Sequence, residues 1–305
     1  MKKILTLIVV IGVLAILYFV YQNREVKILF VGDMFFDRHI RRVMYAKGED
    51  YVFSCIGDFL KSADFVVGNL EGPVTENASV SLVSEVGAPD NFIFTFPTNV
   101  PDLLFKNNIK VVSLGNNHIG NFGKAGIEST KKYLEEAGVS YFGGVTGDEP
   151  VLRKEIGGNK FSFIAYNEFG GESKERVAEK IKKEKEDKQI VIVYAHWGEE
   201  YIAPVARVKS VAKLFADPPT GGGADLIIGA HPHVIQESEV IKIKDDEKIK
   251  EVPVYYSLGN FIFDQYWNGG VSTGLVLEVK IKGDKMEISE RKVSIHKDGR
   301  TCLAD

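Results

Sequence analysis

Five apolar runs of this chain each end in side chains that can bind metals, and this pattern constrains the fold most. The runs end in Gly32-Asp33, Gly68-Asn-Leu-Glu71, Gly115-Asn-Asn-His118, Ala195-His-Trp-Gly198 and Gly229-Ala-His-Pro-His233. Carboxylates, amide oxygens and neutral imidazoles are ligands of borderline divalent metals. Because α/β folds place their chemistry at the carboxyl ends of strands, the five ends predict one shared site.

The composition is that of a folded globular protein. The chain has 305 residues, of which 45% are hydrophobic and 26% charged, so it is neither disordered nor low in complexity. This length allows one large domain or two moderate ones. The net charge of -4 lacks the basic excess of a nucleic-acid-binding protein, and we therefore expect no nucleic-acid partner.

The first segment differs from the rest of the chain. Lys2 and Lys3 precede an uncharged apolar run at 4–21, which is about long enough to span a bilayer. No small-x-small cleavage signal follows it, although a cleaved signal peptide is the main alternative. The positive charge before the run exceeds that after it, which favours a cytoplasmic N-terminus. We expect residues 1–25 to form a single-pass anchor in the cell membrane and residues 26–305 to form one extracytoplasmic domain.

The cysteine content is small. Only Cys55 and Cys302 are present, so metal binding through CxxC pairs is excluded. An extracytoplasmic domain permits a disulfide between them. Two unpaired buried thiols fit the sequence equally well.

Strand-like runs alternate with helical stretches from residue 26 onward. We expect strands at 26–31, 65–67, 110–114, 161–166, 190–194, 226–228 and 252–258, with an antiparallel pair at 275–281 and 286–296. We expect helices at 39–46, 51–61, 100–107, 123–137, 173–188 and 205–215. Residues 76–100 form a long loop, and loops of this length are often functional. The order predicts a layered α/β fold, parallel in its core with antiparallel additions.

The histidine motifs carry most of the chemical information. His118 follows two asparagines at a strand end, where a plain loop is the alternative reading, because Asn tolerates left-handed turns. A histidine there can act as an acid near neutral pH. His231 and His233 flank one proline, and on an extended segment both rings would point to the same side. A single histidine at a strand end is more often structural than a ligand, so His196 is a candidate only because the other motifs accompany it. His39 and His296 have no such neighbouring motifs.

The acidic motifs are less specific taken singly. Asp33 follows a glycine at the end of a buried strand, where a turn or helix cap is the alternative. Gly68 permits a sharp turn that could direct Asn69 and Glu71 toward one pocket. The neighbouring pair Asp37 and Arg38 could hold the shape of the loop or bind an anion.

Together the motifs offer enough ligands for one or two divalent ions. Such a site activates water and clamps the oxygens of a phosphoester or acyl centre. Six ordered motifs also resemble the CapA-type capsule synthesis proteins, which are associated with poly-γ-glutamate biosynthesis. They are Gly32-Asp-Met-Phe-Phe-Asp-Arg38, Gly68-Asn-Leu-Glu-Gly-Pro73, Ser113-Leu-Gly-Asn-Asn-His118, His196-Trp-Gly-Glu-Glu-Tyr201, Gly229-Ala-His-Pro-His233 and Tyr256-Ser-Leu-Gly-Asn-Phe261.

The resemblance extends from about Lys27 to Gln265. This family is similar to the calcineurin-like metallophosphoesterases, so the resemblance implies a four-layer α/β/β/α sandwich. It also implies a divalent metal, Mn, Zn or Fe. The metal ligands carried over are Asp33, Asn69, Glu71, Asn117, His196, His231 and His233.

The resemblance also assigns roles within this set. Asp33 and His233 would hold the first metal, and Asn117, His196 and His231 the second. Asn69 stands where metallophosphoesterases use a bridging Asp, with Glu71 close by. The catalytic residues would be Asp33 and His118, the latter as the acid that protonates the leaving group.

Three positions depart from the pattern of these relatives. Phe35 replaces the His of the phosphoesterase D-x-H motif, Asn69 replaces the bridging carboxylate, and Asn121 stands where an Asp is usual. The first two changes weaken metal binding, and the third removes an acidic partner of the histidines. The site would hold one metal, or two with help from Glu71.

Two functions follow from these motifs. The first is a metal-dependent hydrolase or transferase acting on a phosphoester or a γ-glutamyl polymer. The second is a non-catalytic membrane component that binds and guides an anionic exopolymer, together with other capsule-synthesis membrane proteins. Few residues separate Tyr21 from Val26, so under either function the domain would lie close to the membrane.

Overall fold

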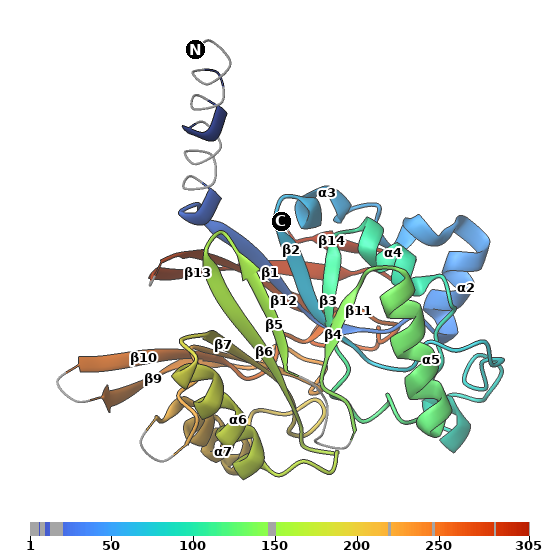
Figure 1. The fold of residues 1–305 in the computed structure, drawn as a ribbon. Helices are drawn as coiled ribbons and strands as arrows, with labels where there is room; N and C mark the ends of the chain where they lie inside the picture. Colours follow the sequence, from blue (N-terminus) through green and yellow to red (C-terminus); the bar gives the residue numbers. More distant parts are fainter. Residues whose placement is uncertain are drawn as a thin grey trace.

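The computed structural model describes residues 6, 10–12, 21–145, 151–218, 221–245, 248–283 and 285–304. Two mixed β-sheets pack face to face, and helices cover the outer face of each (Figure 1). The chain order of strands and helices matches the predicted α/β alternation.

The first sheet has eight strands in the order β14-β13-β12-β1-β2-β3-β4, with β11 also paired to β1. Its strands are β1 (Val26–Met34), β2 (Phe65–Leu70), β3 (Ile109–Ser113), β4 (Ser140–Phe142), β11 (Asn260–Ile262), β12 (Thr273–Lys282), β13 (Lys285–Ile295) and β14 (Thr301–Leu303). β1 to β4 run parallel, whereas β12, β13 and β14 add antiparallel. The predicted antiparallel pair near the C-terminus is thus confirmed.

The second sheet has six strands in the order β5-β6-β7-β8-β10-β9. Its strands are β5 (Leu152–Ile156), β6 (Asn159–Asn167), β7 (Ile190–His196), β8 (Leu226–Ala230), β9 (Ser238–Asp245) and β10 (Lys248–Tyr255). The four inner strands are parallel, and β5 and β9 pair antiparallel at the edges. β7 and β8 are almost wholly buried apolar runs, as expected for parallel strands covered on both faces.

The helices form the two outer layers. α2 (Arg38–Lys47), α3 (Gly57–Lys61), α4 (Val100–Lys106) and α5 (Gly123–Glu136) lie on the first sheet, and α6 (Lys174–Glu186) and α7 (Ala206–Ala216) on the second (Figure 1). α6 buries Val177, Ala178 and Ile181 on one face, and Ser173 caps its N-terminus by accepting from the Arg176 amide at 3.3 Å. A third apolar cluster fills the space between the sheets. The layer order is therefore helices, sheet, sheet, helices.

Some sequence predictions are wrong in detail. The helix expected at 51–61 is divided into a 3-10 turn at Glu49–Phe53 and α3, because the chain turns at Ser54 so that Cys55 can reach Cys302. The strand expected at 252–258 ends at Tyr255, after which the chain crosses to the first sheet as β11. β4, β5, β9, β11 and β14 were not predicted. They are short or lie at sheet edges, where apolar runs are weak.

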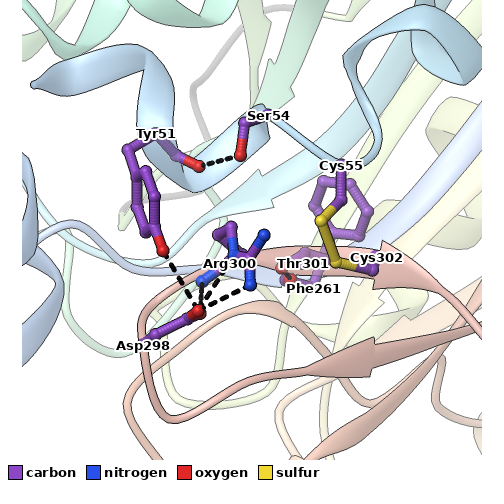
Figure 2. The surroundings of a disulfide bond; sticks show 8 residues. All are labelled: Tyr51, Ser54, Cys55, Phe261, Asp298, Arg300, Thr301 and Cys302. Carbon is purple, nitrogen blue, oxygen red and sulfur yellow. Dashed lines mark hydrogen bonds and ion pairs between the residues drawn. A yellow bond between two sulfur atoms is a disulfide. The ribbon is translucent and has the colours of Figure 1, made fainter. Parts of the chain in front are cut away.

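The disulfide between Cys55 and Cys302 resolves the alternative that the sequence left open (Figure 2). It joins positions 247 residues apart and fixes β14 to the turn before α3. Beside it, Asp298 accepts from Tyr51 Oη at 3.1 Å and from Arg300 Nε at 2.9 Å. The C-terminal hairpin is thereby tied to the helical layer of the first sheet.

The predicted membrane anchor lies largely outside the described residues, which before Tyr21 include only Thr6 and 10–12. Within the described part of the chain, no helix has both the length and the apolar character needed to cross a bilayer. Where the description resumes, Arg24 pairs with Asp64 at 2.7 Å. This contact holds the start of β1 against the segment before β2.

Candidate metal centre

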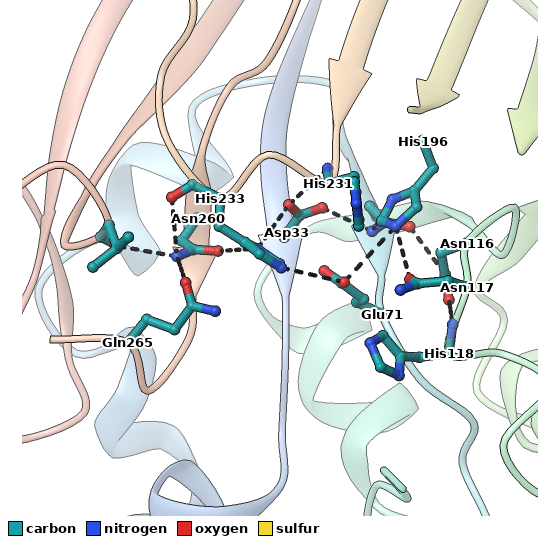
Figure 3. Close-up of polar contacts among 12 residues, drawn as sticks. Asp33, Glu71, Asn116, Asn117, His118, His196, His231, His233, Asn260 and Gln265 are labelled. Carbon is teal, nitrogen blue, oxygen red and sulfur yellow. Dashed lines mark hydrogen bonds and ion pairs between the residues drawn. The ribbon is translucent and has the colours of Figure 1, made fainter. Parts of the chain in front are cut away.

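The strand ends bring all the predicted site residues to one region between the two sheets (Figure 3). Parallel pairing aligns Asp33 of β1 with Asn69 of β2, and His196 of β7 with Ala230 of β8. A Cβ at Gly32 would lie 1.8 Å from the Gly259 carbonyl oxygen. This glycine is therefore required for the crossing segment before β11 to lie against β1 beside the site.

Asp33 links the two sheets at the centre of the site. Its carboxylate is fully buried and accepts from the Asn69 amide Nδ2 at 2.8 Å and from the His231 backbone N–H at 3.1 Å. Its Oδ2 also lies 3.4 Å from His233 Nδ1. Asp33 thus orients the histidine motif of the second sheet from a strand of the first.

Glu71 has the least satisfied environment of the site. It is fully buried, and neither carboxylate oxygen has a hydrogen-bond partner among the described residues. Its Oε1 lies 3.7 Å from His233 Nε2 and 3.8 Å from His196 Nε2. Burial raises the pKa of Glu71 well above its usual range, and the charge of Asp33 raises it further. A buried carboxylate without donors is unfavourable unless a cation faces it.

Burial and the neighbouring charges act in opposite directions on the pKa of His233. Burial alone lowers the pKa of His233, but the negative charges of Glu71 and Asp33 outweigh it and raise this pKa to about 9. This raised pKa keeps His233 protonated at neutral pH.

The two other histidines of the centre remain neutral. Burial lowers the pKa of His196 well below its usual range, and the nearby His231 lowers it further. Burial and the charge of His233 lower the pKa of His231 to about 4. His196 Nε2 lies 2.9 Å from Asn117 Oδ1, and His196 Nδ1 lies 3.3 Å from Asn69 Nδ2. Neutral imidazoles are the form that binds metals.

His118 stands at the solvent-facing edge of the site, next to the exposed Asn117. Its ring packs on Phe94 with centroids 4.1 Å apart, and its Nδ1 lies 3.3 Å from Asn121 Oδ1. Burial lowers the pKa of His118 to about 4, and His231 and His233 contribute in the same direction. Asn121 therefore fills the position of the usual acidic partner with a neutral acceptor, which still orients the ring.

The His231-Pro-His233 segment is not extended, and this sequence prediction is wrong. His231 and His233 have φ values of 95° and 58°, in the left-handed region that is unfavourable for residues with a Cβ. The rings still lie on one site, with centroids 5.9 Å apart. Strained backbone of this kind concentrates at functional sites.

Phe35 takes no part in the polar centre. It is fully buried, stacks on Phe263 with centroids 4.7 Å apart and meets Phe94 edge-on at 4.7 Å. The position at which the resemblance would place a histidine is thus part of an apolar cluster beneath the site.

Of the two roles predicted for Asp37 and Arg38, holding the shape of the loop is confirmed for Asp37, although the two residues do not form an ion pair with each other. Asp37 instead pairs with Arg41 at 2.9 Å and accepts from Ser79, Ser81 and the Thr95 amide. Arg38 pairs with Asp264, 2.5 Å away. The fully buried Asp37 therefore anchors the long 76–100 loop rather than binding a ligand.

Asn260 is a site residue that the sequence reasoning did not single out. Its Oδ1 lies 2.9 Å from His233 Nδ1, and its Nδ2 donates to Gln265 Oε1 at 3.0 Å. A signal was available, because Ser-Leu-Gly-Asn occurs at both 113–116 and 257–260. Asn116 has a matching role, donating to Asn69 Oδ1 at 3.1 Å.

The residues present fit a divalent cation. Glu71, His231 and His233 each offer a ligand atom, and these atoms lie within 4.8 Å of one another. Both Glu71 oxygens and His231 Nδ1 are buried without hydrogen-bond partners among the described residues. One carboxylate and two imidazoles are a donor set typical of Zn²⁺ and similar ions.

The fold and this cluster define the class of protein: an α/β protein of two mixed sheets with a candidate metal site at the strand ends. Residues 27–265 match the family described as bacterial capsule synthesis protein PGA_cap, and the chain belongs to this family. The family assignment agrees with the resemblance seen in the sequence motifs.

Two curated relatives are similar over most of the chain. The capsule biosynthesis protein CapA of Bacillus anthracis is 29% identical over 277 residues, which cover 84% of this chain and 64% of that protein. The PGA biosynthesis protein CapA of Bacillus subtilis (strain 168) is 27% identical over 276 residues, covering 84% and 68%. The chain therefore spans about two thirds of the length of these relatives. A crystal structure of a novel phosphatase from Mycoplasma pneumoniae aligns with a TM-score of 0.47 and 12% identity, over 88% of this chain and 93% of that one.

Proposed function

We propose that this protein is a membrane-anchored enzyme of capsule biosynthesis, a metal-dependent hydrolase or transferase with a site of metallophosphoesterase type. The observation that carries the proposal is the buried, unpartnered carboxylate of Glu71 facing His231 and His233. Such an arrangement is costly in a metal-free protein. It is accounted for if the site exists to hold a cation.

The substrate would be an anionic polymer or a phosphoester. One relative is named for PGA biosynthesis, and this supports a γ-glutamyl polymer as the first substrate to test. A bound Mn, Zn or Fe ion would polarise a phosphoryl or acyl oxygen and lower the pKa of a water. Glu71, His231 and His233 would hold it, with Asp33, Asn69, Asn117 and His196 around them.

His118 would act on the substrate from the open edge of the site. Its Nδ1 faces the side-chain oxygen Oδ1 of Asn121. In the neutral ring Nδ1 therefore carries the proton and Nε2 does not. An anionic group bound beside the ring would favour its protonated form, which the proposed role as a leaving-group acid requires. Asp33 would support the reaction by orienting His231 and His233.

The membrane topology is part of the same proposal. The anchor would be residues 1–25, with the N-terminus in the cytoplasm and the domain outside. The Cys55–Cys302 disulfide supports this location, because disulfides persist in oxidising compartments. Asp33 lies seven residues along β1 from Val26, which is about 23 Å at 3.3 Å per residue. The site would thus lie away from the point where the chain leaves the membrane.

A specific observation favours a second candidate, a non-catalytic component that binds and guides an anionic exopolymer with partner membrane proteins. The Asn69 side-chain amide donates a hydrogen bond to Asp33. The position where metallophosphoesterases use a bridging Asp therefore carries no charge in this chain. The Phe35 side chain packs within the apolar cluster beneath the site. Both features reduce the ability of the site to hold a second ion.

One experiment separates these two functions. The purified full-length chain is assayed for bound metal and for Mn²⁺- or Zn²⁺-dependent turnover of a generic phosphodiester and of poly-γ-glutamate. His118→Ala should lower turnover by about 10²- to 10⁴-fold without loss of metal. His296→Ala, an exposed histidine outside the site, is the matched control. A parent protein with neither metal nor turnover refutes the enzyme, and polymer binding without turnover supports the second candidate.

A further inference from the structure

A basic groove lies next to the candidate metal centre. It has a volume of about 580 Å³, and the residues that matter for its chemistry are Arg38, Arg42, Asp264, Tyr266, Trp267 and Lys297. We call this the basic groove. It is formed by α2, the 76–100 loop, the segment after β11 and the turn after β13.

The charges of the basic groove are only partly neutralised. Asp264 is paired with Arg38 through both carboxylate oxygens, at 2.5 and 3.1 Å. Arg42 donates to the Leu82 carbonyl oxygen, and no carboxylate of the described residues forms an ion pair with it. For Lys297, the described residues include no carboxylate within ion-pair distance of its ammonium group. Two cations from distant parts of the chain therefore face one open groove.

Tyr266 provides an independent indication of a ligand. Its hydroxyl is buried and has no hydrogen-bond partner among the described residues, although the side chain lines the basic groove. Buried tyrosine hydroxyls usually find a partner. The hydroxyl itself is not exposed in the groove, so an acceptor bound there would reach it only after the Tyr266 ring rotates.

Two rows of contacts connect the basic groove to the metal centre. On one side, Trp267 meets Tyr201 at 5.6 Å, and Tyr201 lies 6.1 Å from His233 between ring centroids. On the other side, the Arg38 guanidinium lies 5.1 Å from the centre of the Phe94 ring, which packs on His118. A ligand with one unit at the centre would place its next units in the groove.

We propose that the basic groove is a binding subsite for the carboxylates of an extended anionic chain, next to the unit that lies at the metal centre. The inference rests on the proposed function, in either its catalytic or its guiding form. Lys297 and Arg42 would supply the charge, the Tyr266 hydroxyl a hydrogen bond, and the exposed Trp267 a surface for the chain. Recognition would then increase with chain length, because a single unit cannot occupy both places.

Trp267 makes this proposal directly measurable. The chain has two tryptophans; Trp267 is 61% exposed in the groove and Trp197 is fully buried elsewhere. We would titrate the full-length protein with free glutamate and with γ-linked glutamate oligomers of increasing length, and follow tryptophan fluorescence and its quenching by acrylamide. Longer oligomers should bind more tightly and protect Trp267. Affinity that does not depend on length overturns the proposal.

Two variants test the residues of the groove. Lys297→Glu should weaken binding of long oligomers about tenfold, since it reverses one facing charge. Tyr266→Phe should weaken it about three- to tenfold with unchanged thermal stability, because the hydroxyl has no hydrogen bond to the described residues that could be lost. Lys213→Glu, the same change on the exposed face of α7, is the control. The site would be refuted if Lys213→Glu lost as much affinity for long oligomers as Lys297→Glu, or if Lys297→Glu lost none.

Two further measurements distinguish the possible failures. Glu71→Gln should lose metal yet keep oligomer binding in the groove. Groove binding in a parent protein that takes up no metal would leave the subsite standing and refute the metal-dependent enzyme, while it would support the guiding function. Metal uptake without oligomer binding would refute the subsite and leave the metal-dependent function standing. Inorganic polyphosphate that binds as well as the glutamate oligomers, with the same dependence on Lys297, would overturn the assignment to carboxylates.

Discussion

Glu71 offers the sharpest test of the metal centre, because metal-free and metal-bound proteins should respond oppositely to its replacement. Its carboxylate is fully buried with no donor to either oxygen among the described residues. An unsatisfied buried polar group costs about 1–3 kcal/mol. Burial of the Glu71 charge outweighs its attraction to His233, since the pKa of Glu71 is raised overall. Glu71→Gln keeps the shape and a polar group but removes this charge, so the metal-free variant should be more stable than the parent by about 1 kcal/mol, the lower end of this range.

Addition of metal should reverse the order. An ion present at about 100 times its Kd stabilises the parent by about 2.7 kcal/mol, whereas the variant lacks the only carboxylate of the Glu71, His231 and His233 cluster. For a domain of this size, 1 kcal/mol corresponds to about 2–4 °C in Tm. The parent should therefore gain about 5–10 °C with Mn²⁺ or Zn²⁺, and the variant little.

Differential scanning calorimetry of the full-length protein, in EDTA and in excess metal, measures both effects. Glu128→Gln removes an exposed carboxylate of α5, whose side chain is 62% exposed, and should change neither condition. The reasoning fails if metal-free Glu71→Gln is less stable than the parent. It also fails if metal still stabilises the variant as strongly as the parent.

Three further predictions follow from the site and the disulfide. Metal binding at pH 7 should release about one proton from His233, and this release should fall as the pH rises through about 9, the raised pKa of His233; calorimetry in buffers of different ionisation enthalpy measures it. Asn69→Asp should tighten metal binding but destabilise the metal-free protein, since its carboxylate would face Asp33 where the amide now lies 2.8 Å away; metal titrations and urea unfolding test the two halves. Cys302→Ser should lower the free energy of unfolding by about 2–5 kcal/mol, and an unchanged urea midpoint would contradict a structural role for the disulfide.

The sequence predicted the central strands because their apolar runs are long and continuous. β1, β2, β3, β7 and β8 are buried on both faces, and such strands leave a clear apolar signal. Edge strands such as β5 alternate exposed and half-buried residues. Their existence depends on a neighbouring strand, which the local sequence does not reveal.

The candidate site was predictable as a set of residues but not as a geometry. Parallel strands bring their carboxyl ends together, so strand order alone suggested that Asp33, Asn69 and His196 would meet. The left-handed backbone at His231 could not be foreseen, because it is imposed by tertiary contacts such as the bond from its N–H to Asp33. Asn260 reaches His233 only because the chain crosses between sheets at β11.

The charges of the centre suggest how many ions it holds. Its buried carboxylates are those of Asp33 and Glu71, whereas Asn69 and Asn121 contribute neutral amides. One divalent cation would balance two carboxylates, and a buried site is most stable when its charges are compensated. A second cation would leave an excess of two positive charges unless an anionic ligand entered with it. With two carboxylates and two neutral amides, the centre therefore favours one bound divalent ion. Any second ion would depend on an anionic substrate, which the basic groove beside the centre would help to bind.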